Sequence, residues 1–407
     1  MSEKIAYVVS QFPKFSETFV QREVSEINRS DHDIQIYSLK TPEDIESEIN
    51  IEDKNWLKHC NYSQLISITV VRSCLRALIV FRLSVLLAFL NTLWHLRKTP
   101  VEALKLIAVF PKSLHYAISL NQFNVDHIHA HWANTPSTIA FMLSRLMNDV
   151  TYSFTGHAWD IHSDNTNKDF LETKIKDAEV VVTCTGYNRN YLNSLDKGDT
   201  PVRRNYHGLI PEDYTSTRED TEQTYMLAGG RLVEKKGFDN LVKSLGKIKN
   251  GKGYEIPTVI FGDGPMEEEL RSLKDQYNLT ELTLVGRIDH SEVKEYLEDA
   301  QVFVAPSIIP EDGDIDGIPN VILEAFASST PAIGSDMSGI PEVVIPGETG
   351  WLVDPDNIDQ LATACNKAWK SPEDCAELGR NGRSKVDEDF DIRKNVKEYI
   401  EIIGEQY

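Results

Sequence analysis

Cysteine is scarce in this sequence, and its few positions form no pattern. The 407 residues include five cysteines, an odd number without a CxxC pair. A small secreted domain held together by disulfides needs paired cysteines and an oxidising compartment. The chain therefore suits a reducing compartment better than a disulfide framework.

Net positive charge is lacking too. The sequence has 63 acidic and 42 basic residues, which gives a formal charge of −21 at pH 7. Because nucleic acid is itself an anion, we expect no nucleic acid among the partners of this protein. The first residues also lack the charged and then apolar pattern of a secretory signal, so we expect a cytoplasmic location.

Residues 61–120 differ from the rest of the chain. They contain seven basic residues and one acid, a charge of +6 against −27 elsewhere, and they are rich in Leu, Ile, Val and Phe. Their longest run without a charged residue, Leu83–Leu96, is too short to span a bilayer, which takes about 20 residues. Two interpretations remain: an element that lies on an anionic membrane surface, or core-facing helices whose arginines reach out to solvent.

Short apolar runs alternate with longer helical patterns along the whole chain. This alternation predicts parallel sheets covered by helices. The polar stretch 211–223 reads as a linker, so we expect two doubly wound α/β domains, 1–212 and 213–388. Ligands of such folds bind beyond the carboxyl ends of the strands, here in the cleft between the domains. The runs are residues 5–10, 34–39, 125–131, 151–156, 179–185 and 202–208, then 225–230, 258–264, 282–287, 302–307, 331–335 and 351–355.

The stretch LAGGRLVEKKGFDNL (227–241) places a glycine turn and two cations after a predicted strand. Gly229 and Gly230 permit a tight turn and the close approach of a ligand. Arg231 can bind phosphate oxygens in a fork and Lys236 as a point charge, which favours a diphosphate site. The alternative is a solvated basic turn before a helix.

An acidic loop, EDGDIDG, follows the predicted strand 302–307. Its alternating acids resemble the start of a calcium loop, but the twelfth position would be Leu323 instead of a bidentate carboxylate, which argues against calcium. A helix then begins near Pro319, and its free N–H groups at 318–321 suit a phosphate. Glu324, the one acid in VILEAFA, should have a partner. Phosphate held by N–H groups and hydroxyls held by carboxylates describe a sugar nucleotide, whereas a merely solubilising loop leaves Glu324 unexplained.

Histidines follow two predicted strands of the first half. His157 comes after a strand and a glycine and should point toward a ligand, where a neutral imidazole can hydrogen-bond a hydroxyl; the alternative is a structural histidine. The motif HIHAH (127–131) puts three histidines on one face of a strand. They span about 13 Å, too far to share one zinc ion, so we expect no metal. His131, at the strand end, is expected near the ligand.

The loop SQFPKFSETF (10–19) joins the first predicted strand to the first helix and should open toward the same ligand. Thr18 and Gln21 have the spacing of a capping box. Glu17 either contacts an acceptor substrate or only favours the dipole of the helix start.

Together these motifs resemble glycosyltransferase family 4, the retaining GT-B enzymes, over nearly the whole chain. GRLVEKKG resembles the donor-diphosphate motif of that family, DGIPNVILEA its EX7E motif, and SGIPEVVIPGETGWLVDP the stretch that follows. SQFPKFSETF and HIHAHWANTPSTIAFMLSRL with YSFTGHAWDIH are similar to the branch that builds bacterial exopolysaccharides, such as the colanic-acid-type transferases. The resemblance implies a GT-B fold: two Rossmann-like doubly wound parallel-sheet domains that face across a cleft, with the last helix, about 389–407, packed back on the first domain.

The resemblance also implies roles for single residues. Arg231 and Lys236 would hold the nucleotide diphosphate in place of a metal, Glu324 the ribose, and Asp316 the donor sugar beside His157. Asp316 departs from the usual Glu and is one methylene shorter. The implied sets are catalytic His157, Asp316 and Glu324; donor-binding Gly230, Arg231, Lys236, Gly262, Gly317, Ile318, Pro319, Asn320 and Glu324; and acceptor-side Glu17, Thr18 and His131.

The activity that the resemblance implies is transfer of a hexose-type sugar, with retention, from a UDP- or GDP-linked donor. The acceptor would be a lipid-linked oligosaccharide at the inner face of the cell membrane, and neither a cofactor nor a metal would be needed. Two alternatives stay open. A sugar-nucleotide 2-epimerase of the same fold would need no acceptor, and a non-catalytic protein at the membrane surface would bind a sugar nucleotide without turnover.

Overall fold

The chain forms two compact units. These are an N-terminal domain, Met1–His207 with Ile392–Tyr407, and a C-terminal domain, Gly208–Asp391. Most of the predicted linker 211–223 lies outside the described residues. The computed structural model describes residues 4–15, 17–30, 32–49, 54–65, 67–147, 149–195, 198–214 and 225–404.

The N-terminal domain is built on a seven-stranded parallel sheet in the order β3-β2-β1-β4-β5-β6-β7. Six of these strands lie in the apolar runs predicted from the sequence. The edge strand β3 was missed, because two residues are too few to form an apolar run. The strands are β1 (Lys4–Gln11), β2 (Asp33–Lys40), β3 (Cys60–Asn61), β4 (His127–His131), β5 (Thr151–Gly156), β6 (Val181–Thr183) and β7 (Val202–Arg204).

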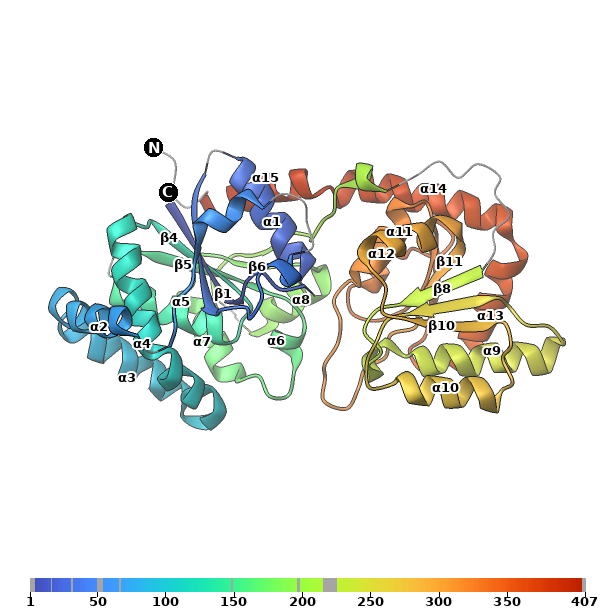
Figure 1. The fold of residues 1–407 in the computed structure, drawn as a ribbon, viewed down its shortest axis with the longest axis horizontal. Helices are drawn as coiled ribbons and strands as arrows, with labels where there is room; N and C mark the ends of the chain where they lie inside the picture. Colours follow the sequence, from blue (N-terminus) through green and yellow to red (C-terminus); the bar gives the residue numbers. More distant parts are fainter. Residues whose placement is uncertain are drawn as a thin grey trace. The chain divides into compact units, whose positions relative to one another are not determined.

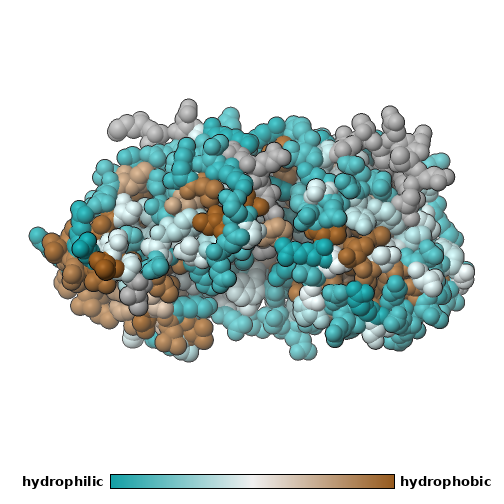
Figure 2. All heavy atoms as spheres, in the orientation of Figure 1, coloured by the Kyte–Doolittle hydropathy of each residue, from teal (hydrophilic) through white to brown (hydrophobic). Residues whose placement is uncertain are grey.

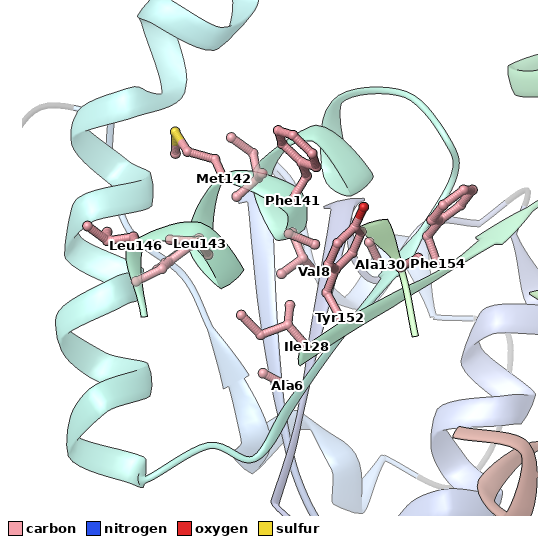
Figure 3. Packing of buried hydrophobic residues seen from close by; sticks show 14 of the residues in the cluster. Ala6, Val8, Ile128, Ala130, Phe141, Met142, Leu143, Leu146, Tyr152 and Phe154 are labelled. Atoms are coloured by element: carbon pink, nitrogen blue, oxygen red, sulfur yellow. The ribbon is translucent and has the colours of Figure 1, made fainter. Parts of the chain in front are cut away.

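Helices alternate with these strands, as in a doubly wound fold (Figure 1). The core lies between the sheet and the helix after β4, where Val8, Ile128 and Tyr152 of the strands meet Phe141 and Leu143 of that helix (Figure 3). The helices of this domain are α1 (Thr18–Arg29), α2 (Ile68–Val80), α3 (Leu83–His95), α4 (Pro100–Phe123), α5 (Thr135–Leu146), α6 (Trp159–His162), α7 (Lys168–Asp177), α8 (Gly186–Leu195) and α15 (Ile392–Gly404).

The last helix, α15, belongs to the N-terminal domain although it ends the chain. It packs against α1. Its Tyr399 is buried beside Tyr7 of β1, with ring centroids 6.5 Å apart. Asn395 accepts a hydrogen bond from Asn205 through its carbonyl and donates one to Tyr206 through its side chain.

The C-terminal domain has a six-stranded parallel sheet in the order β10-β9-β8-β11-β12-β13. Every strand lies within or next to a predicted run. The strands are β8 (Tyr225–Gly229), β9 (Thr258–Phe261), β10 (Leu282–Gly286), β11 (Ala300–Ala305), β12 (Ala332–Ser335) and β13 (Gly350–Val353). The helices are α9 (Phe238–Lys252), α10 (Glu267–Gln276), α11 (His290–Asp299), α12 (Asn320–Ala327), α13 (Ile358–Lys370) and α14 (Pro372–Asp389).

The helices α2, α3 and the first half of α4 expose apolar side chains to an unusual degree. Figure 2 shows hydrophobic residues gathered over this part of the N-terminal domain, at the left of the view. Ile68 is 74% exposed and Trp94 63% exposed, so the interpretation of core-facing helices is wrong for these residues.

Among the described residues, no single helix could span a bilayer, whereas α2 and α3, bent by 105°, have the length and composition only as a pair. We call this surface the apolar platform: Ile68, Val71, Leu75, Leu78, Ile79, Val80, Leu83, Leu86, Leu87, Leu90, Trp94, Val101, Leu104 and Ile107.

Candidate functional site

Two glycines shape the carboxyl ends of β8 and β9 in the C-terminal domain. Gly230 has a φ of 133° and Gly262 a φ of 122°, values that side chains rarely allow. A Cβ on Gly262 would lie 1.8 Å from the carbonyl oxygen of Gly230. The two turns touch through bare backbone, so a ligand can approach the strand ends closely.

Two lysines and two aspartates form an ion-pair cluster beside this turn. Lys236 Nζ lies 2.6 Å from Asp316 Oδ2. Lys235 Nζ lies 2.7 Å from Asp314 Oδ1 and 3.1 Å from Asp316 Oδ1. Burial alone would raise the pKa of Asp316, but Lys236 and Lys235 outweigh burial and lower that pKa to about 2. Asp314 and Asp316 of the loop are thus partners of lysines, a role that needs no calcium ion.

The N-terminus of α12 lies at the same strand ends. No side chain caps it, because its N-cap residue is Pro319. A small hollow there is lined by Gly229 and Lys236, by Ser307 after β11, and by Pro319 and Val321. Free N–H groups at a helix start and a lysine in one hollow suit an anion such as phosphate.

Of the other predicted donor residues, Arg231 is exposed beside the turn, and Gly317 and Ile318 are partly buried just before α12. Asn320 is the first residue of that helix. The structure therefore brings the predicted glycine turn, Lys236, Asp316 and the helix start together at one edge of the sheet.

Glu324 is buried in α12 and has a partner that the sequence did not reveal. His290 Nε2, from α11, lies 3.2 Å from Glu324 Oε1. The hydroxyl of Tyr214 lies 3.4 Å from the same ring nitrogen, His290 Nε2. The expectation of a partner for Glu324 is confirmed, but His290 stands 34 residues earlier, in a stretch without any motif.

The N-terminal domain gathers histidines at the ends of β4, β5 and β7. His131, at the end of β4, is fully buried and donates or accepts at both ring nitrogens. His157 follows β5 and His207 follows β7, and their Nδ1 and Nε2 atoms lie 3.1 Å apart. Burial lowers the pKa of His157 well below its usual value and that of His207 to about 4, so both rings are neutral at pH 7.

The backbone of His157 is fixed as well. Its N–H donates to Asp160 Oδ1 at 2.9 Å, and its carbonyl accepts from the Asn188 side chain. Burial raises the pKa of Asp160 to about 6 against the effect of its hydrogen bonds to backbone N–H groups.

The other histidines of HIHAH are structural. His127 hydrogen-bonds Thr151 and Ser153 at 2.7 and 2.6 Å, and His129 hydrogen-bonds Ser153 and Thr155 at 2.7 and 3.0 Å. Both rings are completely buried, and β5 supplies all of these partners.

A group of potential metal ligands occurs where the sequence did not suggest one. Among the described residues, His157, Cys184 and His207 bring their ligand atoms within 4.8 Å of one another. The two imidazoles already hydrogen-bond each other, so this arrangement is satisfied without an ion.

The loop before α1 differs in detail from the prediction. The N-cap of α1 is Glu17, and no side chain caps the helix, so the capping box of Thr18 and Gln21 is wrong. The Gln21 side chain instead donates to the carbonyls of Lys14 and Glu48. Glu17 pairs with Lys14 at 2.5 Å, and burial raises the pKa of Glu17. Phe19 of this helix packs on His207, with ring centroids 4.2 Å apart.

Two doubly wound parallel-sheet domains, with a glycine turn, lysines and an uncapped helix start at the strand ends of the second, are features typical of proteins that bind anionic ligands such as nucleotides. A comparison with known protein families gives a more specific result. Residues 210–385, most of the C-terminal domain, match the family model "Glycosyl transferases group 1".

Curated relatives carry names from exopolysaccharide synthesis. The chain is 37% identical over 167 residues to a putative colanic acid biosynthesis glycosyltransferase, WcaL, of Salmonella typhimurium, a match that covers 40% of this chain and 41% of the relative. It is 30% identical over 199 residues to the amylovoran biosynthesis glycosyltransferase AmsK of Erwinia amylovora, which covers 48% of this chain and 49% of the relative. The chain thus spans less than half the length of these relatives.

Solved structures share the fold over the whole chain. Anabaena HepE in complex with UDP superposes with a TM-score of 0.74 at 14% identity, covering 99% of this chain and 100% of that one. Sucrose-phosphate synthase from Thermosynechococcus elongatus gives a TM-score of 0.72 at 19% identity, covering 99% and 98%. The predicted GT-B fold is confirmed.

Proposed function

We propose that this protein is a retaining glycosyltransferase that moves a hexose-type sugar from a nucleotide-diphosphate donor to a lipid-linked oligosaccharide during exopolysaccharide synthesis. The observation that carries the proposal is the meeting of Gly230, Lys236, Asp316 and the start of α12 at one sheet edge. The names of the relatives support a transferase in polysaccharide synthesis. A structural neighbour that binds UDP supports a nucleotide-linked donor.

In this proposal the C-terminal domain holds the donor. The diphosphate lies against the N–H groups of α12 and the Lys236 ammonium, and Arg231 reaches it from the exposed side of the turn. Glu324, held by His290, accepts hydrogen bonds from the ribose hydroxyls. Asp316 accepts hydrogen bonds from the sugar while it orients the two lysines. These charges make a metal unnecessary.

The chemistry is an exchange of two bonds at one carbon. The acceptor oxygen bonds to the anomeric carbon as the bond from that carbon to the diphosphate breaks, and both events occur on the same face. The proton of the acceptor hydroxyl passes to the departing phosphate oxygen. Lys236 and the helix start neutralise the charge that develops on the diphosphate, which is where most of the rate acceleration would arise.

The test is a panel of UDP-, GDP- and ADP-linked sugars, incubated with and without a lipid-linked acceptor extract, with released nucleoside diphosphate as the readout. We expect release from one donor, increased by acceptor. Lys236→Ala should lower kcat/KM about 100-fold or more. Lys243→Ala, which removes a lysine of α9 paired to Asp239, is the matched control and should stay near the wild type.

Other outcomes of the panel would support a different function. An altered sugar without nucleotide release indicates the 2-epimerase, and binding without turnover indicates the non-catalytic protein. Full activity of Lys236→Ala would contradict the proposed donor site.

We also propose that the protein works at the inner face of the cell membrane and lies on anionic lipid through the apolar platform. Among the residues that the structure describes, eighteen large apolar side chains are exposed, and fifteen of them belong to residues 65–107. The same segment also exposes five basic residues, which are Arg72, Arg76, Arg82, Arg97 and Lys105. The one acid there, Glu102, is paired with Lys105 at 2.6 Å. An apolar surface with basic residues complements anionic headgroups and the acyl boundary below them.

Liposome co-sedimentation tests this contact. Neutralising Arg72, Arg76 and Arg82 should weaken binding to anionic liposomes about 100-fold, because each basic residue near such a surface contributes about 1 kcal/mol. The matched charge control neutralises Lys252, Arg271 and Lys274 of the C-terminal domain and should leave binding intact.

A second pair of variants tests the apolar contribution. Leu86→Ser should also release the protein, whereas Ile309→Ser, an exposed apolar residue of the other domain, should not. Equal binding of all these variants, or self-association through the platform in the absence of lipid, would contradict membrane contact.

A further inference from the structure

The N-terminal domain holds a cavity of about 70 Å³ that the proposed donor site does not use. Ala133 and Asn134 line it directly after β4, Trp159 and Asp160 line it after β5, and further lining comes from α7 and the connection between α3 and α4. The cavity thus lies at the carboxyl ends of parallel strands, where ligands of such folds bind. One bound water needs about 10–15 Å³ of such space, so there is room for a group such as the hydroxymethyl of a sugar.

Two buried charged residues line this cavity without pairing with each other. Lys174 is 4% exposed and Asp160 is 2% exposed, yet no ion pair joins them in the part of the chain that the structure describes. Lys174 Nζ donates to the Ala133 carbonyl and to Ser137 Oγ. The Asp160 oxygens accept from the backbone N–H groups of Ala133 and His157. Because a buried charged group is costly unless its hydrogen bonds are made, the positions left open on both groups call for a partner.

A hydroxyl group suits these open positions in every protonation state of the two residues. Burial lowers the pKa of Lys174 to about 7 and raises the pKa of Asp160 to about 6. A protonated Lys174 has three N–H groups for its two acceptors, and the neutral amine has a lone pair in place of the third N–H. Asp160 accepts hydrogen bonds when ionised and also donates one when protonated. Since a hydroxyl both donates and accepts, it fits all of these cases.

The other polar groups of the cavity favour a neutral ligand. Asn134 Oδ1 is buried and receives no hydrogen bond from any residue that the structure describes. Glu102, which accepts a hydrogen bond from Thr135 at 3.2 Å, adds a second acid to the lining. With two acids and one lysine around it, an anion such as phosphate would meet like charges, whereas hydroxyl groups would not.

The cavity borders the apolar platform. Trp159 is 47% exposed, so its large apolar ring is available to pack on a sugar at the surface. Leu96 and Glu102 also line the cavity. Leu96 lies two residues after Trp94 of the platform, and Glu102 directly follows Val101 of the platform. A sugar attached to a lipid that rests on the platform can therefore reach this cavity.

We propose that this cavity binds a hydroxyl-bearing group of the acceptor's membrane-proximal sugar, which bridges Lys174 and Asp160 while Trp159 packs on the sugar ring. The occupant is a neutral sugar carried on an apolar chain. The inference rests on the proposed function for the place of this sugar in the reaction. None of the three residues belongs to the acceptor-side set that the resemblance to family 4 implied.

Binding of alkyl glycosides to the full chain tests this site without any turnover. Octyl glucoside carries a neutral sugar, and octyl phosphate carries an anion on the same apolar chain. The six tryptophans are labelled with fluorine and followed by NMR, and Trp159→Phe assigns one signal. Below its micelle concentration, octyl glucoside should shift the signals of Trp159 and Trp94, and octyl phosphate should shift only that of Trp94. No shift of Trp159 with octyl glucoside, or an equal shift with octyl phosphate, would overturn the inference.

A pair of lysine variants on α7 tests the polar contact. Lys174→Met keeps the length of the side chain and removes its nitrogen, so it should weaken octyl glucoside binding about 10-fold, the loss of one hydrogen bond. Lys168→Met is the matched control, because Lys168 donates to the His162 carbonyl and the Tyr191 hydroxyl, outside the cavity lining. It should stay within about 2-fold of the wild type. Equal binding by a folded Lys174→Met variant would contradict the site.

A second pair keeps the test decisive if Lys174→Met does not fold. Trp159 and Tyr187 are both exposed aromatic residues of this domain, so replacing either by Ala should leave the fold intact. Trp159→Ala should weaken octyl glucoside binding about 5-fold, because an aromatic contact is lost, whereas Tyr187→Ala should not. Equal binding by the two variants would overturn the inference.

Kinetics with the lipid-linked acceptor separate this inference from the proposed function. Trp159→Ala should raise the KM for the acceptor about 5-fold with a smaller effect on kcat. A fall in kcat at an unchanged acceptor KM would contradict an acceptor site. If the wild type turns over no donor, the proposed function fails while the glycoside titration still decides this inference. If the donor is turned over but Trp159 does not respond to octyl glucoside, this inference fails alone and the cavity holds only water.

Discussion

The two domains share one topology but build their strand ends from opposite chemistry. The C-terminal domain uses charges: Lys235 and Lys236 against Asp314 and Asp316. The N-terminal domain uses the imidazoles of His131, His157 and His207, joined in a row to one buried carboxylate, Glu23. Charges suit a diphosphate, and imidazole rings suit hydroxyl groups, so each edge fits one part of the sugar transfer that we propose.

The two edges also differ in how tightly their backbones are packed, and a pair of glycine substitutions measures this. Gly262→Ala would place a Cβ 1.8 Å from a backbone oxygen at a φ of 122°, so we expect a loss of about 3 kcal/mol or more in unfolding free energy. Gly156→Ala at the end of β5 meets a flexible Ile161 methyl group at 3.0 Å and should lose about 1 kcal/mol or less. Urea unfolding gives both free energies of unfolding. Equal losses in the two variants would contradict the difference in backbone packing between the edges.

Lowering the pH should destabilise mainly the N-terminal domain. Burial lowers the pKa of His127 to about 3 and of His207 to about 4, and lowers those of His129 and His157 well below 6.5. Between pH 6.5 and 4 these histidines bind protons in the unfolded chain but stay unprotonated in the folded protein. The free energy of unfolding therefore falls as the pH falls, by about 1.4 kcal/mol per pH unit for each ring.

Carboxylates also affect how the stability of each domain depends on pH. Asp160, whose pKa burial raises to about 6, works in the opposite direction, as do Glu17 and Asp177, whose pKa values burial also raises, but these carboxylates are fewer than the four rings. The pKa of Asp316, lowered to about 2, keeps this carboxylate of the C-terminal domain ionised throughout this range. Hydrogen exchange at pH 7 and pH 5 should show faster opening in the N-terminal domain, and equal acceleration in both domains would contradict this reading.

The smallest expected effects concern ion pairs inside and outside the C-terminal cluster. Lys235 is only 8% exposed and faces two aspartates, so Lys235→Ala should cost about 1–3 kcal/mol by leaving partly buried carboxylates short of a partner. Lys54, 46% exposed and paired with the exposed Glu46 in the other domain, should change stability by less than about 0.5 kcal/mol when replaced by Ala. Thermal unfolding of both variants in low and high salt checks the contrast.

Much of the fold could be predicted because its signals are local. Twelve of the thirteen strands of the described chain lie in or beside apolar runs, and only the two-residue β3 gave no run. The glycine turn, the acidic loop and the start of α12 were also predicted, since each is a short contiguous motif. The capping box of Thr18 and Gln21 failed because tertiary contacts to Lys14 and Glu48 recruited the Gln21 side chain.

The sequence by itself determined the strands, the turns, the excess of acid and the basic, apolar character of residues 61–120. Only the tertiary structure decided that this segment exposes its apolar side chains, that Glu324 pairs with His290, and that Glu23 meets His131 across 108 residues of chain. The physical reason is the distance along the chain over which each kind of interaction acts. Propensity and periodicity act over a few neighbouring residues, whereas burial and hydrogen-bond partners depend on which distant segments the sheet order places side by side.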